Sequence, residues 1–288
     1  MTVTEIREPD LVGAFGFPDG VARARAVLAL GGSDGGIPEY FARLLVAEGF
    51  ACLGLAYFNT PDTQPALTEV PLERIERGLR WLRSNSRVEV ANGRISLVGA
   101  SKGAELALLA AASFPELVGP VVAYTPSGFV WEGIDFRSPR PPGRSSWSIK
   151  GRPLPFVPYP ANVRPSRSER GLSVLPIYDA GLNDTSAISD AEIPVERATG
   201  PILLVSGGDD RMWPAERMCR MLVDRLRRSK REHVVMHLNF PEAGHVLFPF
   251  DASAAPMPFD LGGGLEAANA AHASAWPEVL RHLRSGAA

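Results

Sequence analysis

The chain has 288 residues, of which 45% are hydrophobic, enough to bury a large core. Its 30 basic and 32 acidic residues give a net charge of −2, so no global field favours nucleic acid or an anionic membrane. The N-terminus lacks the apolar segment of a signal peptide, and no run approaches the ~20 apolar residues of a membrane span. Cys52 and Cys219 have no metal-ligand spacing and are expected to be buried thiols. These features predict a globular cytoplasmic protein that binds neither nucleic acid nor membrane.

Strands and helices alternate along most of the chain. The elements expected from apolar periodicity are an edge strand within 1–20, strands at 24–30, 50–57, 95–98, 120–124, 202–206 and 233–238, and helices at 38–46, 72–83, after residue 101, at 214–226 and at 267–283. Such alternation predicts an α/β fold with a mainly parallel sheet and helices on both faces. We expect one domain over residues 1–288.

The segment 126–200 interrupts this alternation. It holds 11 of the 26 prolines and few periodic apolar runs. A loop of this length inside a domain is usually a lid, a binding loop or disorder, and the aromatic residues of this one argue against disorder. We therefore predict a partly ordered cap over the carboxyl edge of the sheet. The arginines of this segment fit an anion-binding site and a solvated basic surface equally well.

The pattern Gly-x-Ser-x-Gly from Gly99 to Gly103 stands between the strand at 95–98 and an alanine-rich and leucine-rich helix. In this context it predicts a nucleophile elbow, a sharp turn that exposes the hydroxyl of Ser101 and needs very small residues on either side. On the five residues alone, a chance glycine-rich turn would be as good an interpretation. The flanking strand and helix favour the catalytic one.

A serine nucleophile needs an imidazole base and a carboxylate that orients it. His245 directly follows an apolar strand on a Pro-Glu-Ala-Gly loop, whereas the other four histidines fall within predicted strands or helices. Asp209 and Asp210 both follow the strand at 202–206, and spacing to the next proline favours Asp210. All three predicted triad residues lie just past the carboxyl ends of strands, where such sheets gather catalytic groups.

The oxyanion of the reaction needs two backbone N–H donors. One is expected from Lys102, at the start of the helix after the nucleophile, and the other from Ser33 in the glycine-rich loop 31–36, with Asp34 as the neighbouring option. The Lys102 side chain is expected to be a solvated cation rather than the base. Because the glycine loop fits neither a dinucleotide nor a P-loop fingerprint, no cofactor is predicted. No metal site is predicted either.

Several segments together resemble one protein family. They are Gly32-Ser33-Asp34-Gly35-Gly36-Ile37-Pro38-Glu39-Tyr40, Leu55-Ala56-Tyr57-Phe58, Pro71-Leu72-Glu73, Gly99-Ala100-Ser101-Lys102-Gly103-Ala104-Glu105-Leu106, Ile193-Pro194-Val195-Glu196-Arg197-Ala198, Gly207-Gly208-Asp209-Asp210-Arg211-Met212-Trp213 and Pro241-Glu242-Ala243-Gly244-His245. They are similar to the C-terminal catalytic domain of the acyl-CoA thioesterase and bile acid-CoA:amino acid N-acyltransferase (BAAT) family, which are dienelactone-hydrolase-like α/β-hydrolases. The resemblance implies acyl-thioester chemistry through an acyl-serine, with the triad on Ser101, Asp210 and His245.

Serine at the elbow is found mostly in the hydrolases of that family, so the resemblance favours water as the acceptor. Familiar members carry a β-sandwich of roughly a hundred residues, a domain-sized module, before this domain, and the sequence has no counterpart to it. The expected substrate is therefore a small-molecule acyl-CoA, a thioester on an acyl carrier protein, or an ordinary ester. Transfer to an amine or an alcohol, including ring closure, stays open, as does a catalytically silent binding protein. The sequence does not indicate an oligomeric state.

Selection among substrates is expected from the cap, because the triad serves any ester or thioester. Its aromatic residues could line an acyl pocket while its arginines meet phosphates. The candidate substrate contacts are Asp34, Arg137, Arg140, Arg144 and Trp147.

Overall fold

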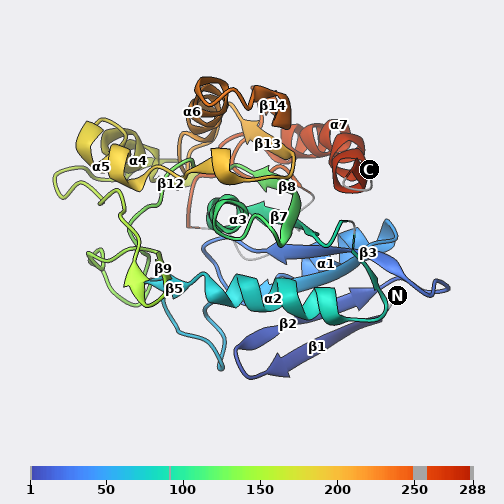
Figure 1. The fold of residues 1–288 in the computed structure, drawn as a ribbon. Helices are drawn as coiled ribbons and strands as arrows, with labels where there is room; N and C mark the ends of the chain where they lie inside the picture. Colours follow the sequence, from blue (N-terminus) through green and yellow to red (C-terminus); the bar gives the residue numbers. More distant parts are fainter. Residues whose placement is uncertain (1, 91, 249–257, 286–288) are drawn as a thin grey trace.

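The computed structural model describes residues 2–90, 92–248 and 258–285 (Figure 1). Its main sheet has the strand order β1-β2-β4-β3-β7-β8-β13-β14, and the short β6 (Val88–Glu89) pairs with β3. The bounds are β1 (Thr2–Glu8), β2 (Leu11–Phe17), β3 (Ala24–Leu30), β4 (Ala51–Ala56), β7 (Ile95–Ala100), β8 (Val118–Tyr124), β13 (Ile202–Gly207) and β14 (Val235–Phe240). All pairings from β4 to β14 are parallel, and β1 and β2 form an antiparallel hairpin at one edge. The predicted mainly parallel sheet is confirmed.

Helices cover both faces of this sheet (Figure 1). Their bounds are α1 (Glu39–Ala47), α2 (Glu73–Ser84), α3 (Lys102–Ser113), α6 (Ala215–Arg228) and α7 (Leu265–Arg284). Side chains alternate along β3, so that Leu28 and Leu30 join a core with α2, α3 and α6, while Val27 and Ala29 join a second core with α1 and α7. The central strands are apolar on both faces because both faces are covered.

No strand of the segment 126–200 joins the main sheet. It contains β9 (Trp147–Ile149), β10 (Arg152–Pro153), β11 (Ser166–Ser168), β12 (Gly171–Ser173), α4 (Leu175–Gly181), α5 (Thr185–Ala191) and the 3₁₀ helix η1 (Val195–Arg197). β9 pairs with β10 and with β5 (Val70–Pro71), which ties the segment to the entry of α2. Residues 126–133 and 145–148 are buried, whereas most of 136–144 and 161–170 is exposed. The segment therefore has a buried inner part and exposed outer loops.

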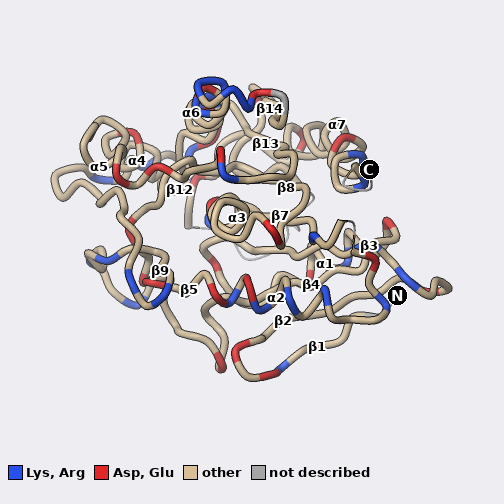
Figure 2. Tube along the Cα trace, viewed as in Figure 1, with Lys and Arg blue, Asp and Glu red and all other residues tan. Residues whose placement is uncertain are grey.

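Two element boundaries differ from the expectation. The stretch 1–20 forms two antiparallel strands rather than one, since the tight turn at Pro9 and Asp10 lets the chain fold back at once. The last strand begins at Val235 because Glu232–Val234 forms a 3₁₀ turn, η2, first. Cys52 and Cys219 are buried free thiols, as expected. Basic and acidic residues are interspersed along the trace (Figure 2), and no helix in the described ranges is long and apolar enough to cross a membrane.

Candidate active site

Ser101 lies at a strained turn between β7 and α3. Its backbone has φ +55° and ψ −121°, a conformation that few non-glycine residues adopt. A Cβ added to Gly99 would lie 2.2 Å from the Gly103 carbonyl oxygen, and one added to Gly103 would lie 2.1 Å from the Gly31 carbonyl oxygen. Only glycine therefore lets the helix start this close to β7 and to the end of β3. The local sequence thus forms the elbow that its spacing predicts.

His245 connects the serine with an aspartate. Its Nε2 lies 2.9 Å from Ser101 Oγ, and its Nδ1 lies 2.8 Å from Asp210 Oδ2. The other carboxylate oxygen of Asp210 accepts the backbone N–H groups of Met212 and Trp213, so the carboxylate is fixed in direction. With the carboxylate on Nδ1, the neutral ring carries its proton there, and Nε2 can accept the serine proton.

The loop that carries His245 is held through its backbone. The N–H of His245 donates to the Leu261 carbonyl at 2.7 Å, and the Thr125 hydroxyl donates to the His245 carbonyl at 3.2 Å. The Trp213 indole donates to the Thr125 carbonyl and its ring contacts the imidazole edge to face, with centroids 5.8 Å apart. These contacts leave the buried imidazole one position, facing the serine.

Asp209 lies elsewhere. It pairs with Arg211 and accepts the backbone N–H of Gly263, so it holds the turn at 260–264 instead of the histidine. Between the two neighbouring carboxylates, the geometry selects Asp210 as the partner of the imidazole.

The loop after β3 borders Ser101. A Cβ on Gly32 would be 3.5 Å from the Cβ of Ser101. The hydroxyl of the buried Tyr57 donates to the carbonyls of Gly31 and Gly32, at 2.7 and 2.9 Å, and burial raises the pKa of Tyr57, which keeps it a donor. Because the C=O and N–H of a trans peptide point in opposite directions, the bond to Gly32 also fixes the N–H of Ser33. Ser33 and Lys102 both line the cavity beside Ser101.

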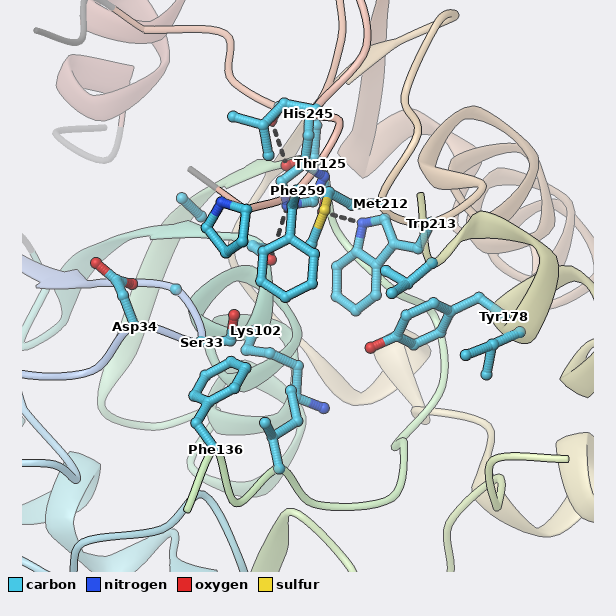
Figure 3. Close-up of a pocket in the computed structure, with 18 of the residues that line it drawn as sticks. Ser33, Asp34, Lys102, Thr125, Phe136, Tyr178, Met212, Trp213, His245 and Phe259 are labelled. Carbon is cyan, nitrogen blue, oxygen red and sulfur yellow. Dashed lines mark hydrogen bonds between the residues drawn. The ribbon is translucent and has the colours of Figure 1, made fainter. Parts of the chain in front are cut away.

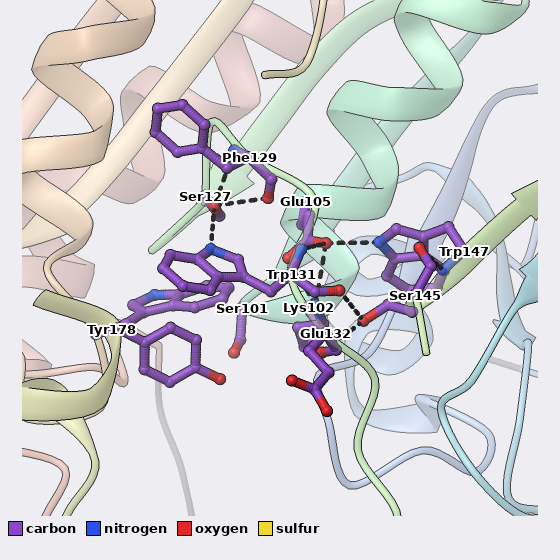
Figure 4. Close-up of polar contacts among 12 residues, drawn as sticks. Ser101, Lys102, Glu105, Ser127, Phe129, Trp131, Glu132, Ser145, Trp147 and Tyr178 are labelled. Atoms are coloured by element: carbon purple, nitrogen blue, oxygen red, sulfur yellow. Dashed lines mark hydrogen bonds and ion pairs between the residues drawn. The ribbon is translucent and has the colours of Figure 1, made fainter. Parts of the chain in front are cut away.

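The side chain of Lys102 is not the solvated cation that the sequence suggested. It is 1% exposed, and its Nζ contacts both oxygens of Glu105, at 3.0 and 2.8 Å (Figure 4). Glu105 also accepts the Trp147 indole N–H at 2.6 Å and the Trp131 backbone N–H at 3.3 Å. Burial lowers the pKa of Lys102 and raises the pKa of Glu105, and each group opposes the shift of the other. The pair joins α3 to the inner part of the segment 126–200.

A cavity of about 2270 Å³ opens above Ser101. Figure 3 shows Ser33 and Asp34 on one side of it, Tyr178 and Trp213 on the other, and Phe136 across from His245. Residues 132–143, 159–165 and 170–178 supply much of its lining, so the segment 126–200 forms a roof over Ser101. We name this segment the roof, and we name the strand-end loops with Ser33, Ser101, Asp210 and His245 the floor.

The candidate substrate contacts separate into two groups. Asp34 and Arg140 line the cavity. Arg137 instead pairs with Asp135, and Arg144 pairs through two bonds with Glu69, whose pKa it lowers. Trp147 is fully buried beneath the Lys102 ammonium, 5.4 Å from ring centroid to Nζ, and does not reach the cavity. Its indole N–H serves Glu105 rather than a ligand.

Several cavity residues were not singled out from the sequence, although arginines and aromatic residues of the cap were expected there. Arg164 and Arg170 line it, as do Glu132, Tyr178 and Trp213. Trp213 had a usable signal, since it stands three residues after Asp210 in a turn whose N–H groups the carboxylate must accept. The others lie in the roof, where no periodicity shows which side chains face inward.

The sheet order and the helices on its two faces define the α/β-hydrolase fold. A dienelactone hydrolase-like promiscuous phosphotriesterase from metagenomic libraries superposes with a TM-score of 0.60 at 14% identity, over 98% of this chain and 97% of that one. The dienelactone hydrolase of Anabaena variabilis gives a TM-score of 0.52 at 18% identity, over 98% and 99%. At these identities the likeness establishes the fold alone.

The family follows from sequence. Residues 70–286 match the family model described as BAAT / Acyl-CoA thioester hydrolase C terminal, so the chain belongs to this family. It is 28% identical to acyl-coenzyme A amino acid N-acyltransferase 2 of Mus musculus, over 97% of this chain and 64% of the relative. It is also 28% identical to acyl-coenzyme A thioesterase 6 of Mus musculus, over 95% and 62%. The chain thus spans less than two thirds of the length of these relatives.

Proposed function

We propose that the protein is a serine hydrolase that cleaves acyl thioesters through an acyl-serine intermediate. The observation that carries this proposal is the hydrogen-bonded series from Asp210 through His245 to Ser101, at 2.8 and 2.9 Å, on a strained elbow under a large cavity. A binding protein has no need of a fixed imidazole tautomer facing a strained serine.

In the first half of the reaction, His245 Nε2 accepts the proton of Ser101 as Oγ attacks the thioester carbonyl. The backbone N–H groups of Ser33 and Lys102 stabilise the oxyanion, and the dipole of α3 adds to this stabilisation. The C–S bond then breaks, and His245 returns the proton to the leaving thiolate. In the second half a water attacks the acyl-serine, His245 takes its proton, and collapse returns that proton to Ser101 with release of the carboxylic acid.

The choice of a thioester rests on the family and on the roof. Arg140, Arg164 and Arg170 line the cavity, where guanidinium groups can bind the phosphates of CoA or of a phosphopantetheine arm. Acyl-CoA and carrier-bound thioesters both carry such phosphates, and an ordinary ester does not. Turnover of matched CoA, phosphopantetheine and simple ester substrates separates the three.

A second candidate is transfer of the acyl group to an amine, because one of the mouse relatives is named as an amino acid N-acyltransferase. The amine would then replace water, losing its proton to His245. Mass analysis of the products with and without glycine, taurine or an alcohol decides between the two. Amide or ester product in place of free acid would overturn the hydrolase assignment, and a lactone would identify ring closure.

The experiment that tests the nucleophile is labelling with a fluorophosphonate followed by intact-mass measurement. We expect one adduct on the wild type and none on Ser101→Ala. A chain that is folded by circular dichroism and gains no adduct at any pH would return the protein to the class of silent binding proteins.

A further inference from the structure

The roof contains a buried carboxylate that the proposed reaction does not use. Glu132 is 3% exposed and lines the cavity. One of its oxygens accepts the backbone N–H of Gly143 at 2.6 Å, and the other accepts that of Tyr159 at 2.7 Å. A carboxylate has about four acceptor positions, so these two bonds leave acceptor capacity unused.

Among the residues that the structure describes, no cation pairs with this carboxylate. In the described ranges, no ion pair involves Glu132, whereas Glu39 pairs with Arg43, Glu69 with Arg144 and Glu105 with Lys102. Removing a charge from water without a counter-charge is unfavourable. A cationic group that enters the cavity would therefore gain both a partner and a hydrogen-bond acceptor at this position.

A series of contacts connects Glu132 with the triad. The Tyr159 hydroxyl donates to the Glu132 carbonyl at 3.0 Å and lies 3.2 Å from the Tyr178 hydroxyl. The Tyr178 ring contacts Trp213, with centroids 5.4 Å apart, and Trp213 contacts His245. In Figure 4 the Ser101 hydroxyl, the Tyr178 hydroxyl and the Glu132 carboxylate point to the same side. Nucleophile and carboxylate thus face one cavity.

We propose that Glu132, with the Tyr178 hydroxyl, forms a subsite for an ammonium group on the acyl chain of the substrate. This inference rests on the proposed function, in which Ser101 receives that acyl chain. The recognised nitrogen is not the attacking acceptor, because a carboxylate stabilises the protonated amine, which is not a nucleophile. The substrate class is therefore amino-substituted acyl thioesters, with phosphates at the arginines and a cation at Glu132.

The test compares N-acetylcysteamine thioesters in matched pairs, β-alanyl with propionyl and ε-aminocaproyl with caproyl, at neutral pH. For at least one pair we expect the wild type to prefer the amino member by roughly ten- to a hundredfold in kcat/KM. Glu132→Gln should abolish this preference, measured as the ratio of the two kcat/KM values within the variant, so that any change in the roof common to both members of a pair cancels. Glu69→Gln, which removes a carboxylate already paired with Arg144, is the matched control and should leave the preference unchanged.

Binding provides an independent readout. In Ser101→Ala protein, calorimetric titration with the ε-aminocaproyl and caproyl amides of cysteamine should give the same preference, and adding Glu132→Gln should remove it. If no thioester is hydrolysed, the proposed function fails while this titration still tests the subsite. If the wild type shows no preference for the ammonium in either assay, or if Glu132→Gln leaves the preference intact, Glu132 only clamps the roof and the inference is overturned. Should Glu132→Gln fail to fold, a wild type that shows no preference for the amino member still overturns the inference.

Discussion

The floor and the roof of the cavity are held by different kinds of contact. In the floor, backbone meets backbone at distances that admit no side chain, as at Gly99 and Gly103. In the roof, three glutamates in different parts of the chain, Glu69, Glu105 and Glu132, accept hydrogen bonds from its loops, and much of 136–144 and 161–170 is exposed. A floor with such close backbone contacts tolerates few substitutions, whereas the exposed loops of the roof can be substituted one at a time. Chemistry should therefore depend on the floor, and substrate selection on the roof.

The largest effect is expected in the floor, at the carboxylate that orients the imidazole. Asp210→Asn should lower kcat by about 10⁴-fold on every substrate, because the amide favours the wrong tautomer of His245. Asp209→Asn, which loses only its contacts to Arg211 and Gly263, is the control and should be far milder. Steady-state kinetics on a CoA thioester and a simple ester measure both variants. A loss confined to one substrate would contradict the division between floor and roof.

The next largest effect is expected at the Lys102–Glu105 ion pair, which connects α3 with the roof. Lys102→Met leaves the buried Glu105 without its cation and should lower the free energy of unfolding by about 3–5 kcal/mol. The double variant Lys102→Met with Glu105→Gln should recover much of the lost free energy of unfolding, since the new amide oxygen still accepts the Trp147 indole N–H. Urea denaturation of the wild type and both variants provides the values. A single variant as stable as the wild type would show that the pair does not join the two regions.

A smaller effect on turnover is expected from Tyr57. Tyr57→Phe removes the hydroxyl that fixes the peptide before Ser33, and it should lower kcat by about ten- to a hundredfold, less than the loss of an oxyanion donor itself. KM should hardly change, because Tyr57 does not line the cavity. The split between kcat and KM separates this positioning role from a general loss of folding. Equal changes in both constants would speak against it.

The smallest effect is expected from the exposed loops of the roof. Arg140→Ala should raise KM for a CoA thioester by about tenfold, the value of one charge-assisted contact, and leave a small neutral ester unchanged. Arg144→Ala is the matched control, since that guanidinium already pairs with Glu69 outside the cavity. If both substrates respond alike to Arg140→Ala, the roof arginines do not bind phosphate.

The sequence predicts the floor far better than the roof, for a physical reason. Ser101, Asp210 and His245 each follow a strand, and parallel strands bring their carboxyl ends together whatever the loops do. The roof has no such rule. Trp147 begins the short strand β9 and Glu132 lies outside the named strands, yet Trp147 is buried against Glu105 and Glu132 faces the cavity. The pairing of β5 with β9 and the bridge between Glu132 and Ser145 place these two residues, and both contacts join segments far apart in the sequence.

Glu105 also bears on the order of assembly. It stands one helical turn after Ser101, and its partners Trp131 and Trp147 follow it by 26 and 42 residues in the chain. While those tryptophans are undocked, Glu105 and Lys102 remain hydrated and the start of α3 lacks its covering layer. We therefore expect the closing of the pocket and the ordering of the start of α3 to be parts of one cooperative step. Replacing the exposed loop 136–144 with that of a homologue should leave this step intact. Replacing residues 131–147 should disturb it, because that segment contains both tryptophans that bind Glu105.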